Sequence, residues 1–285
     1  MKKRVSILLT CHNRKKNTLA CLERVHTIET DQIVLKDVYL VDDGSTDGTA
    51  QAVSEQYPDV AIIKGNGSLF WNKGMHLAFK EAAKRDYDFY LWLNDDTLLY
   101  DNALDVLIEA WKKNQNEACI VSGTTCDPEE KNKTTYGGMR RKKGIHPFKF
   151  ELVEPNETIQ HVDTINGNIV LVPRSVYKKI GNLTKSFPHA FGDMDYAFRA
   201  KKAGCSVIIA QGYLGECSRN SSVGTWKDVT LPFKIRIKKM LSSKGLPFKD
   251  WMLFSFRHGG MLWPVWSFTP YLKVIYNSIL YKKKI

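Results

Sequence analysis

The amino-acid sequence predicts an α/β fold, in which a mostly parallel sheet carries helices on both faces and a helical tail follows at the C-terminus. Short apolar runs alternate with amphipathic stretches through the first 123 residues. The apolar runs are nearly continuous, which is typical of strands buried on both faces. Beyond residue 212 the composition becomes basic and aromatic. We therefore expect one domain over residues 1–212 and a C-terminal extension over residues 213–285.

The elements of the domain follow from these patterns. Strands are expected at residues 5–9, 38–41, 60–64, 89–93, 119–121, 169–172 and 207–210. Helices are expected at residues 18–27, 49–57, 72–85, 101–114 and 193–203. Strand and helix alternate in the first half, so the connections should be right-handed crossovers between parallel strands. Ligands of such sheets bind beyond the carboxyl ends of the strands.

Residues 124–162 interrupt this alternation. The segment is polar, rich in Gly, Lys and Thr, and contains Gly137-Gly138 and Pro147. We predict a long, partly mobile excursion over the sheet, and such loops in compact domains are usually functional.

The net charge of +12 is concentrated in the tail. From Lys227 to the last residue there are twelve Lys or Arg and two Asp, a net charge of +10. The preceding 226 residues hold 30 basic and 28 acidic side chains. The main domain therefore lacks the basic surface of a nucleic-acid-binding protein, and we expect no nucleic acid as a partner.

The tail contains an uncharged stretch, residues 259–272, crowded with apolar and aromatic side chains. Its 14 residues are too few to span a bilayer. Pro264 and Pro270 argue against one uninterrupted helix. Trp and Tyr near Lys282-Lys283-Lys284 fit an anchor in the interface of an anionic membrane. The alternative, a pair of helices that packs back on the domain, is equally open.

The sequence favours a cytoplasmic protein, or one attached peripherally to the inner face of the membrane. The first apolar run is shorter than the apolar core of a signal peptide, and a polar loop follows it at once. The six cysteines show neither a Cys-x-x-Cys pair nor a zinc spacing, which favours reduced thiols.

Acidic side chains gather where the predicted strands end. Asp42 and Asp43 follow the second strand, and folding alone gives no reason to place two adjacent carboxylates there. Thr46 and Asp47 are explained as caps of the next helix, whereas Asp42 is not. A carboxylate at this edge can accept hydrogen bonds from a ribose or a base.

A second acidic group, Asn94-Asp95-Asp96, follows the fourth strand. Oxygen ligands at positions i and i+2 of a strand end project to the same side, and they suit a hard cation that also binds diphosphate oxygens. A helix-opening turn is the alternative explanation. The triplet shares a sheet edge with Asp42, which favours a common site.

A third group, Asp193 and Asp195, opens the last predicted helix of the domain. Carboxylates are favourable there as caps, and the catalytic interpretation is that one of them is a general base. Side chains at i and i+2 point to opposite sides of a helix, so only one can face a substrate. Asp195 could instead orient Arg199, four residues further on.

Residues 6–14, 41–49, 93–96 and 192–199 resemble, in order and spacing, the motifs of family-2 inverting glycosyltransferases of the GT-A fold. The resemblance covers about residues 4–212. It implies a nucleotide-binding half over residues 1–123 and an acceptor and base half over residues 124–212. Residues 65–74 resemble the rhamnosyltransferase branch, and the tail is similar to a subset that builds bacterial surface polysaccharides.

The resemblance implies a role for particular residues. The base would be Asp193, although Gly192 stands where the family has Glu. A divalent cation, Mn²⁺ or Mg²⁺, would bind Asp96 and Asn94. Asn94 replaces the family's Asp, and residues 215–218 lack the His that often follows, so a third ligand stays open. The implied donor-binding residues are Thr10, Asn13, Arg14, Asp42, Asp43, Gly65, Asn66, Asn72, Lys73 and Asp95.

These assignments predict an inverting transfer of a sugar from a nucleotide-diphosphate-sugar to a hydroxyl of a glycan or lipid-linked glycan, in O-antigen or capsule synthesis. A sugar-phosphate nucleotidyltransferase is an alternative that needs no base at Asp193. A non-enzymatic lipid- or nucleic-acid-binding protein would explain the basic tail but leaves three acidic groups unexplained. If Asp193 is not the base, Glu216 is the next candidate, because it follows the last strand of the sheet.

Overall fold

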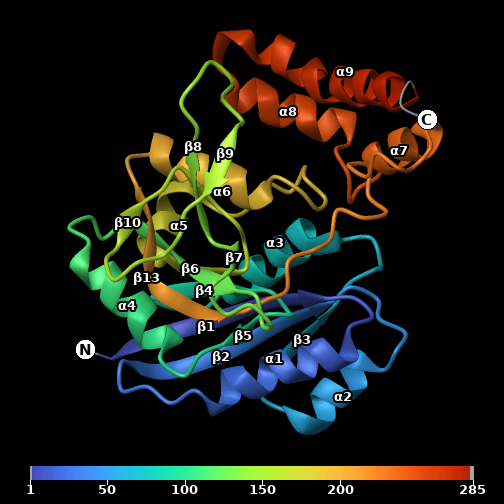
Figure 1. Cartoon of the computed structure of the whole chain (residues 1–285). Helices are drawn as coiled ribbons and strands as arrows, with labels where there is room; N and C mark the ends of the chain where they lie inside the picture. The colour runs from blue at the N-terminus through green and yellow to red at the C-terminus, as the bar shows by residue number, and fades with distance from the viewer. Residues whose placement is uncertain (1, 283–285) are drawn as a thin grey trace.

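The computed structural model describes residues 2–282. Its centre is a mixed sheet with strand order β10-β13-β6-β12-β4-β1-β2-β3. The C-terminal helices, orange and red in Figure 1, gather at the opposite end of the molecule from the first two helices.

Most neighbouring strands of the central sheet are parallel. β1 pairs in parallel with β2 and β4, β2 with β3, and β6 with β13. β12 lies between β4 and β6 and is antiparallel to both. The predicted α/β class with a mostly parallel sheet is confirmed. The strand bounds are β1 Lys3–Cys11, β2 Ile33–Asp42, β3 Ala61–Lys64, β4 Phe89–Leu93, β6 Cys119–Cys126, β12 Ile169–Pro173 and β13 Ser206–Glu216.

Successive side chains of each strand point to opposite faces of the sheet, so they pack in two hydrophobic cores, one on each face. Ile7 and Leu9 pack on one face with α1, α2 and α4, whereas Leu8 packs on the other face with α3, α5 and α6. Helices cover both faces of the sheet, which explains why the strand sequences are continuous apolar runs. The helix bounds are α1 Lys15–Thr27, α2 Thr49–Gln56, α3 Phe70–Ala82, α4 Ala103–Lys113, α5 Arg174–Ile180 and α6 Gly192–Lys202.

The expected strands and helices of the domain are present, and the differences lie mainly at their ends. β2 begins at Ile33 rather than at 38, since its first half is partly exposed and carries polar side chains. β13 continues to Glu216, past the expected domain limit at 212. The sequence does not predict α5, whose seven residues are too few to display a helical period.

Residues 124–162, predicted as an irregular excursion, form short strands instead. β7 and β10 extend the central sheet, while β8 pairs with β9 and β11 in a separate sheet of three strands. Each has between two and four residues, too few for a periodic pattern. Their bounds, with that of β5, are β5 Leu98–Leu99, β7 Thr134–Tyr136, β8 Gly138–Arg141, β9 Phe150–Leu152, β10 Gln160–His161 and β11 Thr164–Ile165.

The tail consists of α7 (Phe233–Met240), α8 (Phe248–His258), a 3₁₀ turn and α9 (Trp263–Lys282). Phe254 of α8 is fully buried against aromatic rings of the domain, those of Phe187, Phe191 and Phe198. α8 therefore packs back on the domain, as one interpretation of the tail requires. Within residues 2–282, no helix is long and apolar enough to cross a membrane.

The expectation that prolines interrupt the uncharged stretch is wrong, because α9 continues through Pro270. Pro270 removes the N–H that would bond to the carbonyl of Trp266. The indole N–H of Trp251, on α8, donates to that carbonyl at 3.0 Å instead. Pro264 lies in the first turn, where the missing N–H has no partner to lose.

Candidate active site

A cavity of about 300 Å³ opens beyond the carboxyl ends of β1, β2 and β4. This is the edge at which α/β sheets bind ligands. Six predicted site residues line it: Thr10, Arg14, Asp43, Asn94, Asp95 and Asp96. The other lining residues are Cys11, His12, Gly67, Phe70, Trp71, His189, Asn220 and Lys244.

The loops after β1 and β2 are joined beside the cavity. The backbone N–H of Asn13 donates to Ser45 Oγ at 2.9 Å, and the N–H of Thr46 donates to Asn13 Oδ1 at 2.7 Å. Asn13 has a φ of 52°, in the left-handed region that Asn tolerates. Asn13 therefore fixes the two loops relative to each other, and Thr10 borders the space that they enclose.

Asp42 and Asp43 both bind backbone amides. Asp42 Oδ1 accepts the N–H of Ser45 at 2.9 Å and closes the turn after β2. Asp43 accepts three N–H groups at the start of α3, those of Gly67 at 2.8 Å, Leu69 at 2.8 Å and Phe70 at 3.0 Å. A helix N-terminus favours a carboxylate, so Asp43 positions α3 as well as lining the cavity.

Gly65 and Asn66 shape the loop that leads into α3. A Cβ on Gly65 would lie 2.7 Å from Asp43 Oδ1, so a larger residue would push that carboxylate away. Asn66 Oδ1 accepts the N–H of Ser68 at 3.0 Å and its hydroxyl at 2.8 Å. Neither residue is among those that line the cavity.

Asn72 and Lys73 lie outside the cavity. Asn72 is fully buried, and its amide donates to two backbone carbonyls in the segment before α6, at 2.9 and 2.6 Å. A Cβ on Gly192 would lie 1.6 Å from Asn72 Oδ1, so α3 and the start of α6 are in close contact. Lys73 lies near Asp250 of α8, where burial raises the pKa of the carboxyl and the lysine charge opposes the rise. Asn72 thus holds α3 against the segment before α6, and Lys73 lies between the domain and its tail.

Arg14 bridges the acidic pair after β4. Its Nη1 lies 3.1 Å from Asp95 Oδ1, and its Nη2 lies 2.6 Å from Asp96 Oδ2. Burial raises the pKa of Asp95 to about 7, although the charge of Arg14 acts in the opposite direction. Arg14 and Asp96 are both partly exposed, so this ion pair can open toward a ligand.

Asn94 and Cys217 complete the surroundings of the pair. Asn94 Oδ1 accepts the indole N–H of Trp71 at 2.7 Å, and Trp71 forms a wall of the cavity. Cys217 lies in the stretch where the sequence leaves a third metal ligand open, and its Sγ is 3.6 Å from Asp96 Oδ1. Burial and the charge of Asp96 raise the pKa of Cys217 to about 12, so it is a thiol at neutral pH.

The donors at this edge fit a cation that is completed by substrate. Among residues 2–282, no group of three His, Cys, Asp or Glu side chains could hold a metal ion by itself. Mg²⁺ is usually held by one or two carboxylates together with substrate phosphates and water. Asp96 lines the cavity and is partly exposed, so it can provide such a carboxylate once Arg14 moves.

Asp193 lies beside the cavity at the start of α6. Its Oδ2 accepts the N–H of Gly167 at 3.0 Å, and its Oδ1 accepts the N–H of Met194 at 2.8 Å. Gly167 packs against Trp71, since a Cβ there would lie 2.2 Å from the ring. Burial raises the pKa of Asp193 to about 6, and the two N–H groups oppose the rise. A carboxylate with such a pKa is suited to general-base catalysis near neutral pH.

Asp195 has different partners, all of them side-chain donors: two arginines, a histidine and a threonine hydroxyl. Arg199 Nε donates at 2.9 Å, as the sequence spacing suggests. Two donors come from α8: Arg257 Nη1 at 3.2 Å and His258 Nε2 at 2.9 Å. Burial favours a higher pKa for Asp195, but the hydrogen bonds from His258 and Thr184 and the charge of Arg199 hold it well below its usual range. The tail is therefore tied to the helix that carries Asp193.

Glu216, the alternative base, lies at the end of β13. Its Oε1 accepts the hydroxyl of Tyr100 at 3.1 Å and forms an ion pair with Lys131. Neither Glu216 nor Asp193 is among the residues that line the cavity. Asp193 is the nearer of the two to the lining, because it binds Gly167, which packs against the lining residue Trp71.

Eight lining residues are not among the predicted site residues, and three of these, His189, Asn220 and Lys244, also lie outside residues 6–14 and 65–74, which carry the resemblance. Burial and the charge of Lys244 lower the pKa of His189. Its buried Nδ1 has no hydrogen-bond partner among the described residues. Lys244 belongs to the basic part of the tail, and that charge is a signal for it. No signal in the sequence marks His189 or Asn220.

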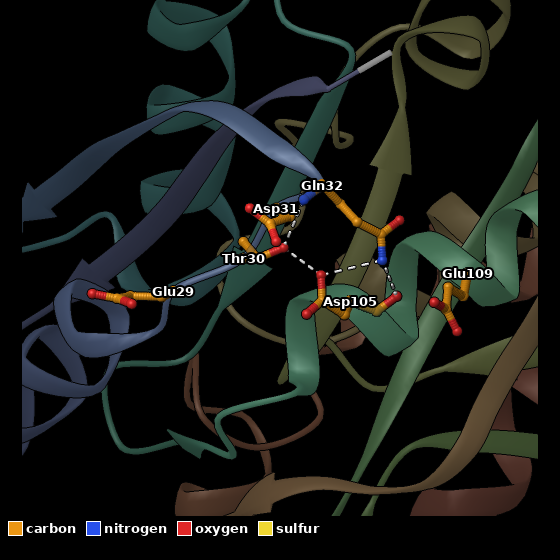
Figure 2. A pocket seen from close by; sticks show the side chains of 6 residues that line it. All are labelled: Glu29, Thr30, Asp31, Gln32, Asp105 and Glu109. Atoms are coloured by element: carbon orange, nitrogen blue, oxygen red, sulfur yellow. Dashed lines mark hydrogen bonds between the residues drawn. The ribbon is translucent and has the colours of Figure 1, made fainter.

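A larger hollow, of about 680 Å³, lies away from these residues, between α4 and the loop before β2 (Figure 2). Asp105 accepts hydrogen bonds there from Thr30 and Gln32. Glu29, Asp31 and Glu109 make the rest of the lining acidic, so it would repel a nucleotide diphosphate. The hollow lies at the amino end of β2, opposite the edge that carries the candidate site.

The fold is the GT-A fold of glycosyltransferases. A solved structure, GalNAc-T7 with UDP, GalNAc and Mn²⁺, matches this fold with a TM-score of 0.58 at 9% sequence identity, over 78% of this chain and 44% of that chain. The chain belongs to glycosyltransferase family 2, whose family model, described as glycosyl transferase family 2, matches residues 6–190.

Two curated relatives are similar to parts of the chain. Poly-beta-1,6-N-acetyl-D-glucosamine synthase of Staphylococcus epidermidis is 26% identical over 180 residues, which are 62% of this chain and 41% of that protein. N-acetylglucosaminyl-diphospho-decaprenol L-rhamnosyltransferase of Mycobacterium tuberculosis is 24% identical over 194 residues, 59% of this chain and 61% of that protein. The chain thus spans less than two thirds of the length of either relative.

Proposed function

We propose that this chain transfers a sugar, with inversion, from a nucleotide-diphosphate-sugar to a hydroxyl of a glycan or lipid-linked glycan in surface-polysaccharide synthesis. The observation that carries the proposal is the pairing of a mostly buried carboxylate of raised pKa, Asp193, with a neighbouring cavity that is lined by both basic and acidic side chains. Membership of glycosyltransferase family 2 and the activities that the names of the two relatives state support glycosyl transfer over nucleotidyl transfer.

The donor would occupy the cavity beyond β1, β2 and β4. Arg14 and Lys244 supply positive charge for a diphosphate, and Trp71 and Phe70 supply aromatic walls. Thr10, Asp43 and Asp95 border the same space as hydrogen-bonding groups. Asn13, Asp42, Gly65 and Asn66 would act by shaping the surrounding loops, while Asn72 and Lys73 hold α3 against α6 and α8.

Asp193 would remove the proton of the acceptor hydroxyl as that oxygen attacks the anomeric carbon. A single displacement of this kind inverts the anomeric configuration and needs no protein nucleophile. The raised pKa of Asp193 makes its carboxylate a stronger proton acceptor than an exposed Asp.

A divalent cation, Mn²⁺ or Mg²⁺, would be held by Asp96, with Asn94 and Asp95 beside it. When bound it would supply positive charge against the departing diphosphate. Arg14 would leave the acidic pair and turn toward the diphosphate. We further propose the cytoplasm, or the inner face of the membrane, as the place of action.

The test begins with nucleotide-sugars screened for thermal stabilisation of the protein in the presence of Mn²⁺. A stabilising donor is then incubated with the protein, and the products are identified by NMR. Release of free sugar with a nucleoside diphosphate, or transfer with an inverted anomeric centre, is the expected result. Release of a sugar phosphate would favour the nucleotidyltransferase, and absence of any turnover with every stabilising donor would favour a binding protein.

A further inference from the structure

The outward face of α9 and of the 3₁₀ turn before it carries apolar side chains that the other described residues leave largely exposed. They form one strip, which begins with Met261 and Leu262 in the turn and continues at intervals of three or four residues along the helix with Val265, Phe268, Leu272, Ile275, Tyr276 and Ile279, each at least 41% exposed. We name these eight residues the outer strip. At 1.5 Å per residue the strip is about 27 Å long.

The inward face of α9 packs on α7 and α8. Among its described side chains Ser267 and Val274 are buried, Tyr271 packs against the aromatic cluster, and Ser278 accepts a hydrogen bond from Arg236 of α7 at 2.8 Å. A surface helix of a globular protein normally turns its apolar side inward and a polar side outward. α9 has apolar side chains on its outward face as well, and a contiguous exposed apolar face of this kind marks an interaction surface.

A basic cavity of about 570 Å³ borders the outer strip. His146, Lys149, Lys227, Arg236 and Lys273 line it, and no acidic side chain of the described residues does. Arg236 is 2% exposed and is fixed by its bonds to Ser278 and to the carbonyl of Trp226. Burial and the charges of Lys149 and Lys273 lower the pKa of His146. This cavity is therefore a preformed site of positive potential for a phosphate group.

We propose that α9 lies in the interface of an anionic bilayer, with the outer strip among the acyl chains and a lipid phosphate in the adjoining basic cavity. Both parts of the surface fit this partner: an apolar helix face inserts at the headgroup boundary, and flanking basic residues bind anionic headgroups. A second copy of the chain fits less well, because it would bring a second tail of net charge +10 against the first. The inference does not depend on the proposed catalytic function.

Flotation of the full chain with phospholipid vesicles tests the proposal. The protein should float with vesicles of phosphatidylcholine mixed with phosphatidylglycerol and much less with phosphatidylcholine alone. Added salt should weaken the binding, because surface charges are screened within about 8 Å at physiological ionic strength.

Variants separate the two parts of the surface. Phe268→Glu with Leu272→Glu should lower vesicle affinity by at least about tenfold, since the strip residues would carry charge into apolar surroundings. Lys149→Gln with Lys273→Gln should lower it by about fivefold per charge and reduce the salt dependence. Val34→Glu, at an exposed apolar site on β2, and Lys113→Gln, on α4, are matched controls that should bind as the wild type does.

Light scattering without lipid measures the oligomeric state and tests the alternative that the outer strip binds a second copy of the chain. A wild-type dimer that becomes monomeric in Phe268→Glu/Leu272→Glu, with no flotation on anionic vesicles, would overturn the membrane proposal in favour of self-association. Equal flotation of wild type and both paired variants would also overturn it. These measurements do not involve sugar transfer, so they can fail while the catalytic proposal stands, and the reverse also holds.

Discussion

At the scale of single residues, two carboxylates two positions apart on α6 have opposite surroundings. Asp193 is mostly but not fully buried and accepts only backbone N–H donors, and desolvation raises its pKa to about 6. Asp195 is fully buried and accepts bonds from three basic side chains, and its pKa falls well below the usual range. Their different partners support the proposal of a proton-accepting role for Asp193 and a structural role for Asp195.

Asp193→Asn tests the proton-accepting role. The variant keeps the shape and an oxygen for the N–H of Gly167 but cannot accept a proton, so kcat should fall by about 10²–10⁴-fold while donor affinity is unchanged. In the wild type, kcat/KM should rise with pH and level off above about 6 as Asp193 ionises. Retention of most of the transfer rate in Asp193→Asn, on a confirmed acceptor, would move the base elsewhere.

The same substitution has a defined effect on stability. The folded-state pKa of Asp193 is raised, so the stability that this group contributes is complete below its unfolded-state value of about 3.9 and is lost as the pH rises through about 6. At neutral pH the buried charge is absent from Asp193→Asn, and the variant should unfold at the same temperature as the wild type or higher. Calorimetric melting at pH 5 and pH 8 measures this difference.

Asp195→Asn should have the opposite balance of effects. Its loss removes the carboxylate partner of Arg199 and Arg257, whose side chains are 24% and 35% exposed, so we expect a cost of about 1.5–3 kcal/mol, the range for hydrogen bonds to charged groups. The folded-state pKa is depressed, so the stabilisation is present above about pH 3.9 and is lost as the pH falls through the folded-state value. Chemical unfolding at neutral pH should show the large loss, whereas kcat should fall less than in Asp193→Asn. A larger fall in kcat than in stability would contradict the structural role.

The proposed cation site at Asp95 and Asp96, after β4, leads to a separate prediction. Asp96→Ala should abolish the Mn²⁺-dependent part of donor affinity, and Asn94→Ala should reduce it less. Arg14→Gln should raise the affinity for Mn²⁺ in the absence of donor by up to about fivefold, because an ion pair that is partly exposed is worth about 1 kcal/mol or less. Calorimetry with Mn²⁺ alone measures the Arg14 effect, and unchanged Mn²⁺-dependent donor affinity in Asp96→Ala would refute the ligand assignment.

At the scale of elements, α8 is the link between the domain and the tail. Its inner side carries Phe254, Arg257 and His258, which contact the aromatic cluster and Asp195 of the domain. Its indole Trp251 also satisfies the carbonyl that Pro270 leaves without an N–H in α9. One helix thus positions both the outer strip of α9 and the helix that carries Asp193.

Phe254→Ala should weaken this link by about 3–5 kcal/mol, since the ring is fully buried and its removal leaves a cavity. Phe256→Ala on the same helix is the matched control, because Phe256 is 62% exposed. Urea unfolding and limited proteolysis of the tail are the measurements. Equal stability of the two variants would show that α8 contributes little to holding the tail.

At the scale of the whole molecule, the tail does more than extend the chain. Lys244 and Asn220 reach the cavity from beyond residue 212, so the predicted extension supplies part of the candidate donor site. The outer strip lies on the last helix of that same unit. Membrane attachment through α9 would therefore hold the candidate active site at a fixed distance from a bilayer.

The sequence by itself determined the fold class, most element positions and the acidic groups of the candidate site. Buried strands and amphipathic helices have strong local periods, and polar side chains after strands lie at one edge of a parallel sheet. These features follow from a few consecutive residues, so Asp43, Asp95 and Asp96 could be placed at one cavity before any contact was known.

Only the tertiary structure decided which partners each side chain meets. Asn72 is buried, His189 and Lys244 line the cavity, and Asp195 is paired with Arg257 and His258. The residues that make each of these contacts lie far apart in the chain, so no local sequence pattern indicates that they meet. The same reason explains α9: Pro270 predicts a break locally, but Trp251, 19 residues earlier, supplies the missing hydrogen bond. Burial and long-range contacts set the pKa of each carboxylate, and the spacing of residues in the sequence indicates neither the burial nor the contacts.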